Sequence, residues 1–209
     1  DELLADAVIR AVENTGYSEL TLSSLSISDY RGLVPLLNRV FPWLTRNGVS
    51  LSLPSLRVDA STIPIIEFTS DVRKSSLTFA VESGSDAMRA RAHKRLDESD
   101  LLEIAAFAAG RGWRHLKLYF MIGLPGCDEH DEAESIRSLI MKILAAGGKK
   151  LELNITVSPF IPKPHTPLQW ARLASLSRST WHRRYLRRRM GKRLHRLRHT
   201  LGYTRRRSW

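Results

Sequence analysis

Short apolar segments typical of β-strands alternate with amphipathic helical segments along most of the chain, and this alternation limits the possible folds more than any other feature. We expect strands at residues 20–22, 49–53, 77–81, 115–122 and 151–157. Parallel strands are joined by helical crossovers of this kind, and those crossovers are right-handed. The chain is therefore predicted to be an α/β protein with a parallel sheet. A closed or partial β/α barrel and an open doubly wound sheet both fit the pattern.

The best-defined helix is expected over residues 128–146. Acidic residues crowd its first turns, where the helix macrodipole favours negative charge, and Gly147 and Gly148 follow its last turn. The chain itself opens inside a helix, at about residues 3–15, with no strand before it. Because a parallel β/α array normally opens with a strand, we expect one unit to be missing at the amino end.

Binding sites in parallel β/α proteins form at the carboxyl ends of the strands. Here the segments after the strands are small, polar or rich in glycine and proline: 23–29, 54–57, 82–85, 123–126 and 158–166. The Glu82 carboxylate can accept hydrogen bonds from ribose hydroxyls or a ligand amine, or its turn can simply cap the next helix. Gly123 can let an aromatic base lie against the backbone, or it can serve the turn alone. Arg57 can bind an anion or pair with a neighbouring carboxylate.

Several classes of protein are excluded by what the sequence lacks. The single cysteine, Cys127, excludes a structural disulfide, and no CxxC, HExxH, Walker loop or Ser-His-Asp order occurs. His195 and His199 are spaced for a metal, but they lie in an arginine-rich segment that opposes a cation. The longest apolar stretch, residues 118–124, is too short to span a bilayer, and the chain opens with acidic residues rather than a signal peptide. We expect a cytoplasmic protein with no membrane partner and no metal ligands of its own.

Four segments considered together resemble the radical S-adenosylmethionine (radical SAM) superfamily. They are LSLPSLRVD at 51–59, LTFAVESGS at 77–85, KLYFMIGLPG at 117–126 and VSPFIPKPHTPLQW at 157–170. They occur in the order expected of the family, one per β/α unit, and the resemblance covers about residues 1–170. The most similar branch is the one whose members often carry a B12-binding-type domain before the radical SAM core.

The resemblance implies a fold, two cofactors and a reaction. The expected fold is an incomplete parallel (β/α) barrel of about five units. The expected cofactors are S-adenosylmethionine and a [4Fe-4S] cluster, which together generate a 5′-deoxyadenosyl radical that abstracts hydrogen from a substrate. In the full-length protein we expect an upstream B12-binding-type domain as a partner of this core.

The resemblance also assigns residues to the S-adenosylmethionine site. The last-strand motif beside the adenine corresponds to residues 160–164. The other matching positions are Ser24, Ser26 and Asp29 for the methionine amino group, Glu82 and Ser83 for the ribose and methionine, Lys94 for the methionine carboxylate, and Ile122 and Gly123 for the adenine.

One departure from the family is plain in the sequence. The defining CxxxCxxC loop is absent, and a [4Fe-4S] cluster of this kind needs three thiolates. Cys127 lies on a different loop, after Leu-Pro-Gly, so we interpret it as an incidental thiol. We therefore expect the cluster ligands to lie outside this chain, with the sequence a carboxyl-terminal portion of a radical SAM core that is inactive by itself.

Charge divides the sequence in two. Residues 172–209 contain 14 Lys and Arg and no acidic residue, whereas residues 1–171 contain the other 19 Lys and Arg with all 21 acids. We therefore predict a barrel domain over 1–171 and a basic, helical tail over 172–209, with helix across 183–189 and 192–198. The alternative function is a cluster-free barrel relative that binds RNA through this tail.

Overall fold

Among the residues that the structure describes, the strand pairs are all parallel and form two sheets. The computed structural model describes residues 2–24, 27–53, 56–59, 62–70, 77–94, 96–190 and 196–199. Strand β1 (Glu19–Thr21) pairs with β2 (Ser50–Ser52). A four-stranded sheet has the order β3 (Leu77–Glu82), β4 (His115–Ile122), β5 (Glu152–Pro159) and β6 (Arg196–His199). The parallel α/β class predicted from the alternation is confirmed.

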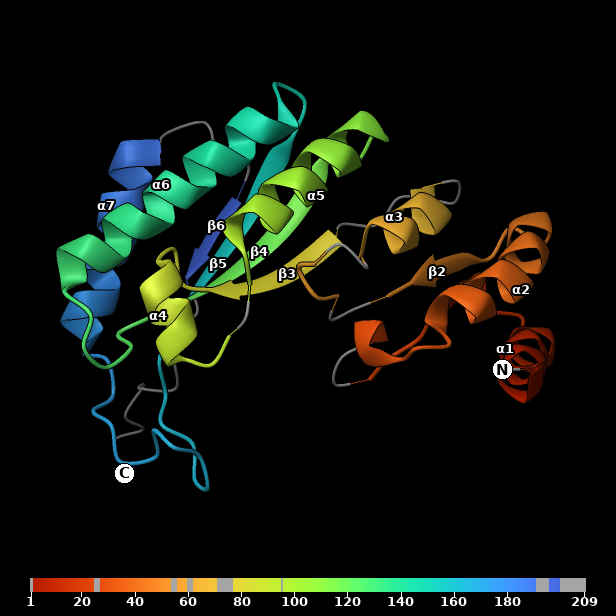
Figure 1. The fold of residues 1–209 in the computed structure, drawn as a ribbon, viewed down its shortest axis with the longest axis horizontal. Helices are drawn as coiled ribbons and strands as arrows, with labels where there is room; N and C mark the ends of the chain where they lie inside the picture. Colours follow the sequence, from red (N-terminus) through yellow and green to blue (C-terminus); the bar gives the residue numbers. More distant parts are fainter. Residues whose placement is uncertain are drawn as a thin grey trace.

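The helices pack in chain order, each one against the next. They are α1 (Glu2–Thr15), α2 (Leu33–Arg46), α3 (Thr62–Ser70), α5 (Glu98–Gly110), α6 (Glu129–Gly147) and α7 (Leu176–Met190), with a short α4 (Asp86–Arg91) and a 3-10 turn (Ile27–Asp29) between them. Figure 1 shows α5 and α6 side by side over one face of the larger sheet.

Strand order decides between the two folds that the alternation allowed. A doubly wound sheet reverses its strand order at a switch point, whereas here β3, β4, β5 and β6 follow one another without reversal. The arrangement is thus the barrel type. Across the described residues the two sheets are separate, so the barrel is not closed, and Figure 1 shows β2 and α2 at the far end of the molecule from α6 and α7.

Burial along the strands alternates with the side-chain period of two. On β4 the residues Leu116, Leu118, Phe120 and Ile122 are fully buried, and the residues between them are half-buried. The buried set belongs to one apolar cluster with helix residues such as Ile104 and Ile136. One face of the sheet therefore packs against the helices, and each fully buried leucine or isoleucine contributes about 1.5–3 kcal/mol.

The basic carboxyl-terminal segment differs in part from its prediction. Its first half is helical, as expected, but Arg196–His199 forms strand β6 on the edge of β5, so the helix predicted across 192–198 is wrong for residues 196–198. The strand was missed because Arg-Leu-Arg-His has no run of apolar residues, and its pairing depends on the exposed edge of β5. Residues 191–195 and 200–209 lie outside the described residues.

Helix α7 packs on α6 through its apolar side chains. Leu186 is 0% exposed and Met190 also belongs to the main core cluster. Figure 1 shows α7 running beside α6 at one end of the molecule. The predicted boundary between residues 171 and 172 stays a prediction. No helix in the described part of the chain has the length and apolar character needed to cross a bilayer.

Candidate functional site

The carboxyl ends of β3, β4 and β5 lie at one edge of the sheet. Residues Ala80, Tyr119 and Thr156 are aligned across the three parallel strands, so the segments that follow them emerge side by side. A small apolar cluster of Met88, Leu124 and Phe160 joins the three segments, and the Phe160 N–H donates to the Ile122 carbonyl at 2.7 Å. The structure thus brings together the expected strand-end residues of this sheet.

Glu82 ends β3 in an unusual conformation. The strand register shifts between Ala80 and Glu82, and Glu82 has a φ of 68°, in the left-handed region that glycine favours. A non-glycine residue held there costs about 1–3 kcal/mol, and such strain clusters at functional sites. Its side chain is half-buried, and no described residue hydrogen-bonds or ion-pairs with its carboxylate. The turn therefore holds a free acceptor at the strand edge.

The turn after Glu82 is fastened by a buried arginine. Arg89 of α4 is 1% exposed, and its Nη1 donates to the Ser83 carbonyl oxygen at 2.6 Å while its Nη2 pairs with Asp86. The Ser83 hydroxyl is buried and accepts the Ser85 N–H at 3.2 Å. Arg89 thus positions the turn on which Glu82 sits. The assignment of Ser83 to a ligand contact stays a prediction.

Gly84 explains why this turn can lie so close to α6. A Cβ on Gly84 would fall 2.2 Å from the backbone carbon of Ser135, well inside any real contact. The turn and the first half of α6 therefore touch backbone to backbone. Helix α4 also contacts the segment after β4. The Arg91 guanidinium of α4 donates a hydrogen bond to the Gly126 carbonyl oxygen at 3.4 Å.

The segment after β4 is held by a buried glutamate. Gly123 has a φ of +82°, and its N–H is shared by both carboxylate oxygens of Glu132, at 2.8 and 3.0 Å. A Cβ on Gly123 would lie 2.4 Å from the Cβ of Ala174. An aromatic base therefore has to approach Gly123 from a side other than the one that Ala174 covers. The adenine contact predicted for Ile122 and Gly123 stays a prediction.

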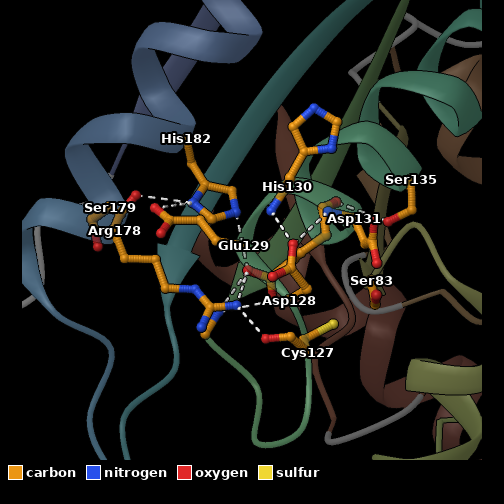
Figure 2. A network of polar contacts seen from close by, with 12 residues as sticks. Ser83, Cys127, Asp128, Glu129, His130, Asp131, Ser135, Arg178, Ser179 and His182 are labelled. Atoms are coloured by element: carbon orange, nitrogen blue, oxygen red, sulfur yellow. Dashed lines mark hydrogen bonds and ion pairs between the residues drawn. The ribbon is translucent and has the colours of Figure 1, made fainter.

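Glu132 also joins a polar network that reaches α7, and Figure 2 labels its members Cys127, Arg178 and His182. Glu132 is 1% exposed, and Arg178 Nη2 lies 3.1 Å from its carboxylate and 3.0 Å from the Cys127 carbonyl oxygen. His182, 0% exposed, has Nε2 at 3.0 Å from the same carboxylate and Nδ1 at 2.9 Å from the Arg178 carbonyl oxygen. Two α7 side chains thereby fix the segment from Gly123 to Cys127.

A second polar cluster ties α6 to α7 nearer the surface. Arg137 and the Tyr185 hydroxyl both hydrogen-bond the Glu134 carboxylate, and these bonds lower the pKa of Glu134 to about 2. The hydrogen bond to Glu134 is also the main cause that raises the pKa of Tyr185. At the start of α6, Asp128 accepts the N–H groups of His130 and Asp131 as the N-cap, which lowers the pKa of Asp128.

The remaining predicted residues lie outside the segments 82–85, 123–126 and 158–166, and their assignment to a ligand stays a prediction. Ser24 and Asp29 follow β1 in the smaller sheet, where Asp29 pairs with Arg57 at 2.9 Å. An anion that binds Arg57 would therefore have to compete with the Asp29 carboxylate. Lys94 follows α4 and is half-buried, with its N–H donating to the Arg89 carbonyl oxygen at 2.8 Å. Ser26 lies outside the described residues.

A [4Fe-4S] cluster does not fit the residues of this chain. The sequence holds one cysteine, and no three His, Cys, Asp or Glu residues among the described ones are grouped to hold a metal ion. Burial, and after it the Glu132 carboxylate, raise the pKa of the Cys127 thiol. The thiol is therefore protonated at neutral pH, whereas iron requires a thiolate.

Sequence reasoning missed the residues that hold the site together. The sequence pattern presents Glu132 as one of several acids in the first turns of α6, and Arg178 and His182 as part of a basic tail. The one available signal was position, because an acid one or two turns into a helix can turn back to the strand-end loop before it. Nothing in the local pattern distinguishes Glu132 from Glu129 or Asp131 in that role.

Taken together, the fold and site define a parallel β/α protein of the open-barrel class, with a polar site at the carboxyl edge of its strands. Among solved structures it is similar to coproporphyrinogen III oxidase (HemN) from Escherichia coli, described as a radical SAM enzyme. The TM-score is 0.62 at 13% sequence identity, over 89% of this chain and 45% of that one. The chain therefore has a radical SAM-like fold.

Sequence comparison adds one curated relative. An uncharacterized protein of Methanocaldococcus jannaschii, MJ0966, is 32% identical over 152 residues, which are 73% of this chain and 32% of the relative. No family model matches the chain. The chain spans about a third of the curated relative and less than half of the HemN chain.

Proposed function

We propose that this chain is the nucleoside-binding part of a radical SAM-type protein and that Glu82 accepts hydrogen bonds from the ribose hydroxyls of S-adenosylmethionine. The observation that carries the proposal is Glu82 itself, a half-buried carboxylate held in a left-handed conformation with no described partner. A preorganised free acceptor of this kind favours a ligand that brings two adjacent hydroxyl donors. The radical SAM-like fold supports the same edge of the sheet as the site.

The residues of this chain divide between contact and support. Glu82 is proposed to bind the ribose, Gly123 and its neighbours the adenine, and Lys94 the methionine carboxylate. Arg89 supports Glu82 through the Ser83 carbonyl, and Glu132 supports Gly123 through its N–H. When bound in a radical SAM enzyme, S-adenosylmethionine supplies the radical that abstracts hydrogen from a substrate. The part proposed for this chain is to hold the nucleoside.

Binding by the chain alone is expected to be weak. The family anchors the methionine end on the cluster, and this chain does not supply the cluster ligands. We expect a dissociation constant of ~1 mM, equivalent to about −4 kcal/mol, because only the nucleoside contacts remain. Ligand-observed saturation-transfer NMR with 5′-methylthioadenosine as the probe measures affinities in this range.

The test substitutes Glu82 by glutamine, which keeps the size of the side chain and removes its charge. Loss of a charged acceptor costs about 1.5–3 kcal/mol, so Glu82→Gln should weaken binding at least about tenfold. The matched control is Glu103→Gln on the exposed side of α5, which should bind as the unchanged chain does. A probe lacking the 2′-hydroxyl should bind weakly to both chains. Equal binding of 5′-methylthioadenosine to Glu82→Gln and the unchanged chain would contradict the proposal.

A further inference from the structure

The outward side of α7 is a stripe of arginines. Arg183, Arg184, Arg187 and Arg188 are all exposed, and their spacing of one and four residues places them within one face of the helix. In the described part of the chain none of these four has a hydrogen bond or ion pair. Four guanidinium groups on one face, with no acid anywhere from residue 172 onward, form a strongly positive surface.

A pair of stacked aromatic rings borders this stripe. Trp181 and Tyr185 have ring centroids 5.1 Å apart with planes inclined by 20°, and Arg189 lies over the Tyr185 ring at 5.8 Å. At 100° per residue, Trp181 and Tyr185 follow directly after Arg184 and Arg188 around the helix. Both side chains are half-buried, so each keeps an accessible surface beside the guanidinium groups.

The opposite side of α7 is already used for packing. Leu186, Met190 and His182 are buried between α7 and the rest of the molecule. An amphipathic helix binds a membrane by inserting its apolar side, and that side of α7 is covered. The exposed side of α7 instead carries positive charge and aromatic rings. Such a surface suits a single nucleic-acid strand, whose phosphates are negative and whose unstacked bases can lie against the rings.

We propose that the outer face of α7 binds single-stranded nucleic acid, with the four arginines on phosphates and the Trp181–Tyr185 pair against a base. The proposal goes beyond nucleoside binding at Glu82, because it uses a different surface and a polymeric partner. Arginine suits this role because its planar fork pairs with phosphate oxygens in a bidentate manner.

The test measures fluorescence anisotropy of a fluorescein-labelled U20 RNA with the full 209-residue chain in 50–200 mM KCl. Each phosphate contact on a single strand contributes a slope of about −0.7 to the plot of log affinity against log salt. Substituting Arg183, Arg184, Arg187 and Arg188 all by glutamine should therefore reduce the slope by about 3. Between 50 and 200 mM KCl the unchanged chain should then lose about 50-fold more affinity than the variant.

The control variant removes the same charge elsewhere. Arg10→Gln, Arg31→Gln, Lys149→Gln and Lys150→Gln together neutralise four exposed cations outside α7, and the slope should change by less than about 1. If the fourfold α7 variant does not give the circular dichroism spectrum of the unchanged chain, Arg183→Gln with Arg187→Gln should reduce the slope by half as much. Trp181→Ala should weaken binding about tenfold, as expected for one stacked base.

Two further ligands distinguish the possible partners. A dT20 DNA shows whether the ribose hydroxyls matter, and either strand supports the proposal if its affinity depends on the α7 arginines. Vesicles of equal phosphatidylglycerol and phosphatidylcholine test the membrane alternative. The proposal is overturned if neither strand binds, if the fourfold α7 variant keeps the full slope, or if vesicles compete with RNA on equal terms.

Discussion

Glu132 connects the loop after β4 to two side chains of α7. It accepts the Gly123 N–H with both oxygens, and it lies within 3.1 Å of Arg178 Nη2 and 3.0 Å of His182 Nε2. A buried carboxylate without such partners would be strongly disfavoured, so these contacts stabilise the buried position of Glu132. The conformation of the loop after β4 consequently depends on side chains of α7, about 50 residues further along the chain.

Substituting Glu132 by glutamine should destabilise the fold by about 3 kcal/mol. The substitution leaves the Arg178 guanidinium, whose side chain is 21% exposed, without its buried counter-ion, and breaking one side of a buried pair costs about 3–5 kcal/mol. Urea unfolding followed by circular dichroism measures the change. Glu103→Gln on the exposed side of α5 should change the free energy of unfolding by less than about 0.5 kcal/mol. A loss for Glu132→Gln no larger than that of this control would contradict the role given to the network.

Stability should fall in acid partly through Glu134. Its pKa is lowered to about 2 from 4.5 by the hydrogen bonds from Arg137 and Tyr185, so the folded state holds this proton less tightly than the unfolded state does. The contribution is then fully present above about pH 4.5 and is lost as the pH falls toward 2. Because Glu134 is partly solvated, we expect a modest effect.

The measurement for Glu134 is the urea midpoint between pH 2 and 6 for the unchanged chain and for Glu134→Gln. The unchanged chain should lose more stability across this window than the variant does. Tyr185→Phe, which removes one of the two hydrogen-bond donors to Glu134, should give an intermediate dependence. Parallel pH curves for all three chains would show that Glu134 has no part in the acid response.

At the scale of elements, the close approach of the β3 turn to α6 and the packing of α7 on α6 define the site. The turn approaches α6 at Gly84, where no side chain fits, and α7 approaches it through Leu186 and the Glu132 network. Helix α6 thus lies between the turn that carries Glu82 and the helix that carries the arginine stripe. Movement of α6 would change both surfaces.

Gly84→Ala tests the first of these contacts. The new Cβ would meet the backbone of Ser135 at 2.2 Å, so the turn or α6 has to shift, and we expect a loss of about 2 kcal/mol. Gly110→Ala is the matched control, since no atom lies within 4 Å of its Cβ position and alanine favours a helix. The control should be neutral or stabilising by up to about 1 kcal/mol in urea unfolding. Equal stability of the two variants would show that the turn and α6 do not touch.

At the scale of the molecule, the chain is an open arc of parallel strands with a helical outer layer. The two-stranded sheet and the four-stranded sheet share one apolar cluster, although no hydrogen bonds join them as a continuous sheet in the described residues. The predicted residues are split accordingly. Glu82 and Gly123 lie at one edge of the larger sheet, whereas Ser24 and Asp29 follow the first strand of the smaller one.

The chain by itself should not assemble a [4Fe-4S] cluster. One protonated thiol cannot replace the three thiolates that such a cluster requires. After anaerobic incubation with iron and sulfide followed by desalting, iron content and visible absorbance should match those of Cys127→Ser. Stoichiometric iron and sulfide on the unchanged chain, absent from Cys127→Ser, would contradict this expectation.

What the sequence by itself determined is the part of the structure that depends on near neighbours. Hydrophobic periodicity located the first five strands and the helices around them to within a few residues. The reason is that residues two apart share one side of a strand and residues three or four apart share one side of a helix. The strand-end position of Glu82 and Gly123 followed from the same alternation. The resemblance of four strand-end segments to the radical SAM superfamily indicated the barrel type, which strand order then established.

Only the tertiary structure decided what depends on distant partners. The strained conformation of Glu82 follows from a register shift against β4, and the pairing of β6 from the free edge of β5. Glu132 has its structural role because Arg178 and His182 contact it, and the charge pattern of the sequence places these two residues in a separate basic segment. The physical reason is that burial converts these charges from solvated surface groups into coupled ones, and burial is a property of packing that no local pattern contains.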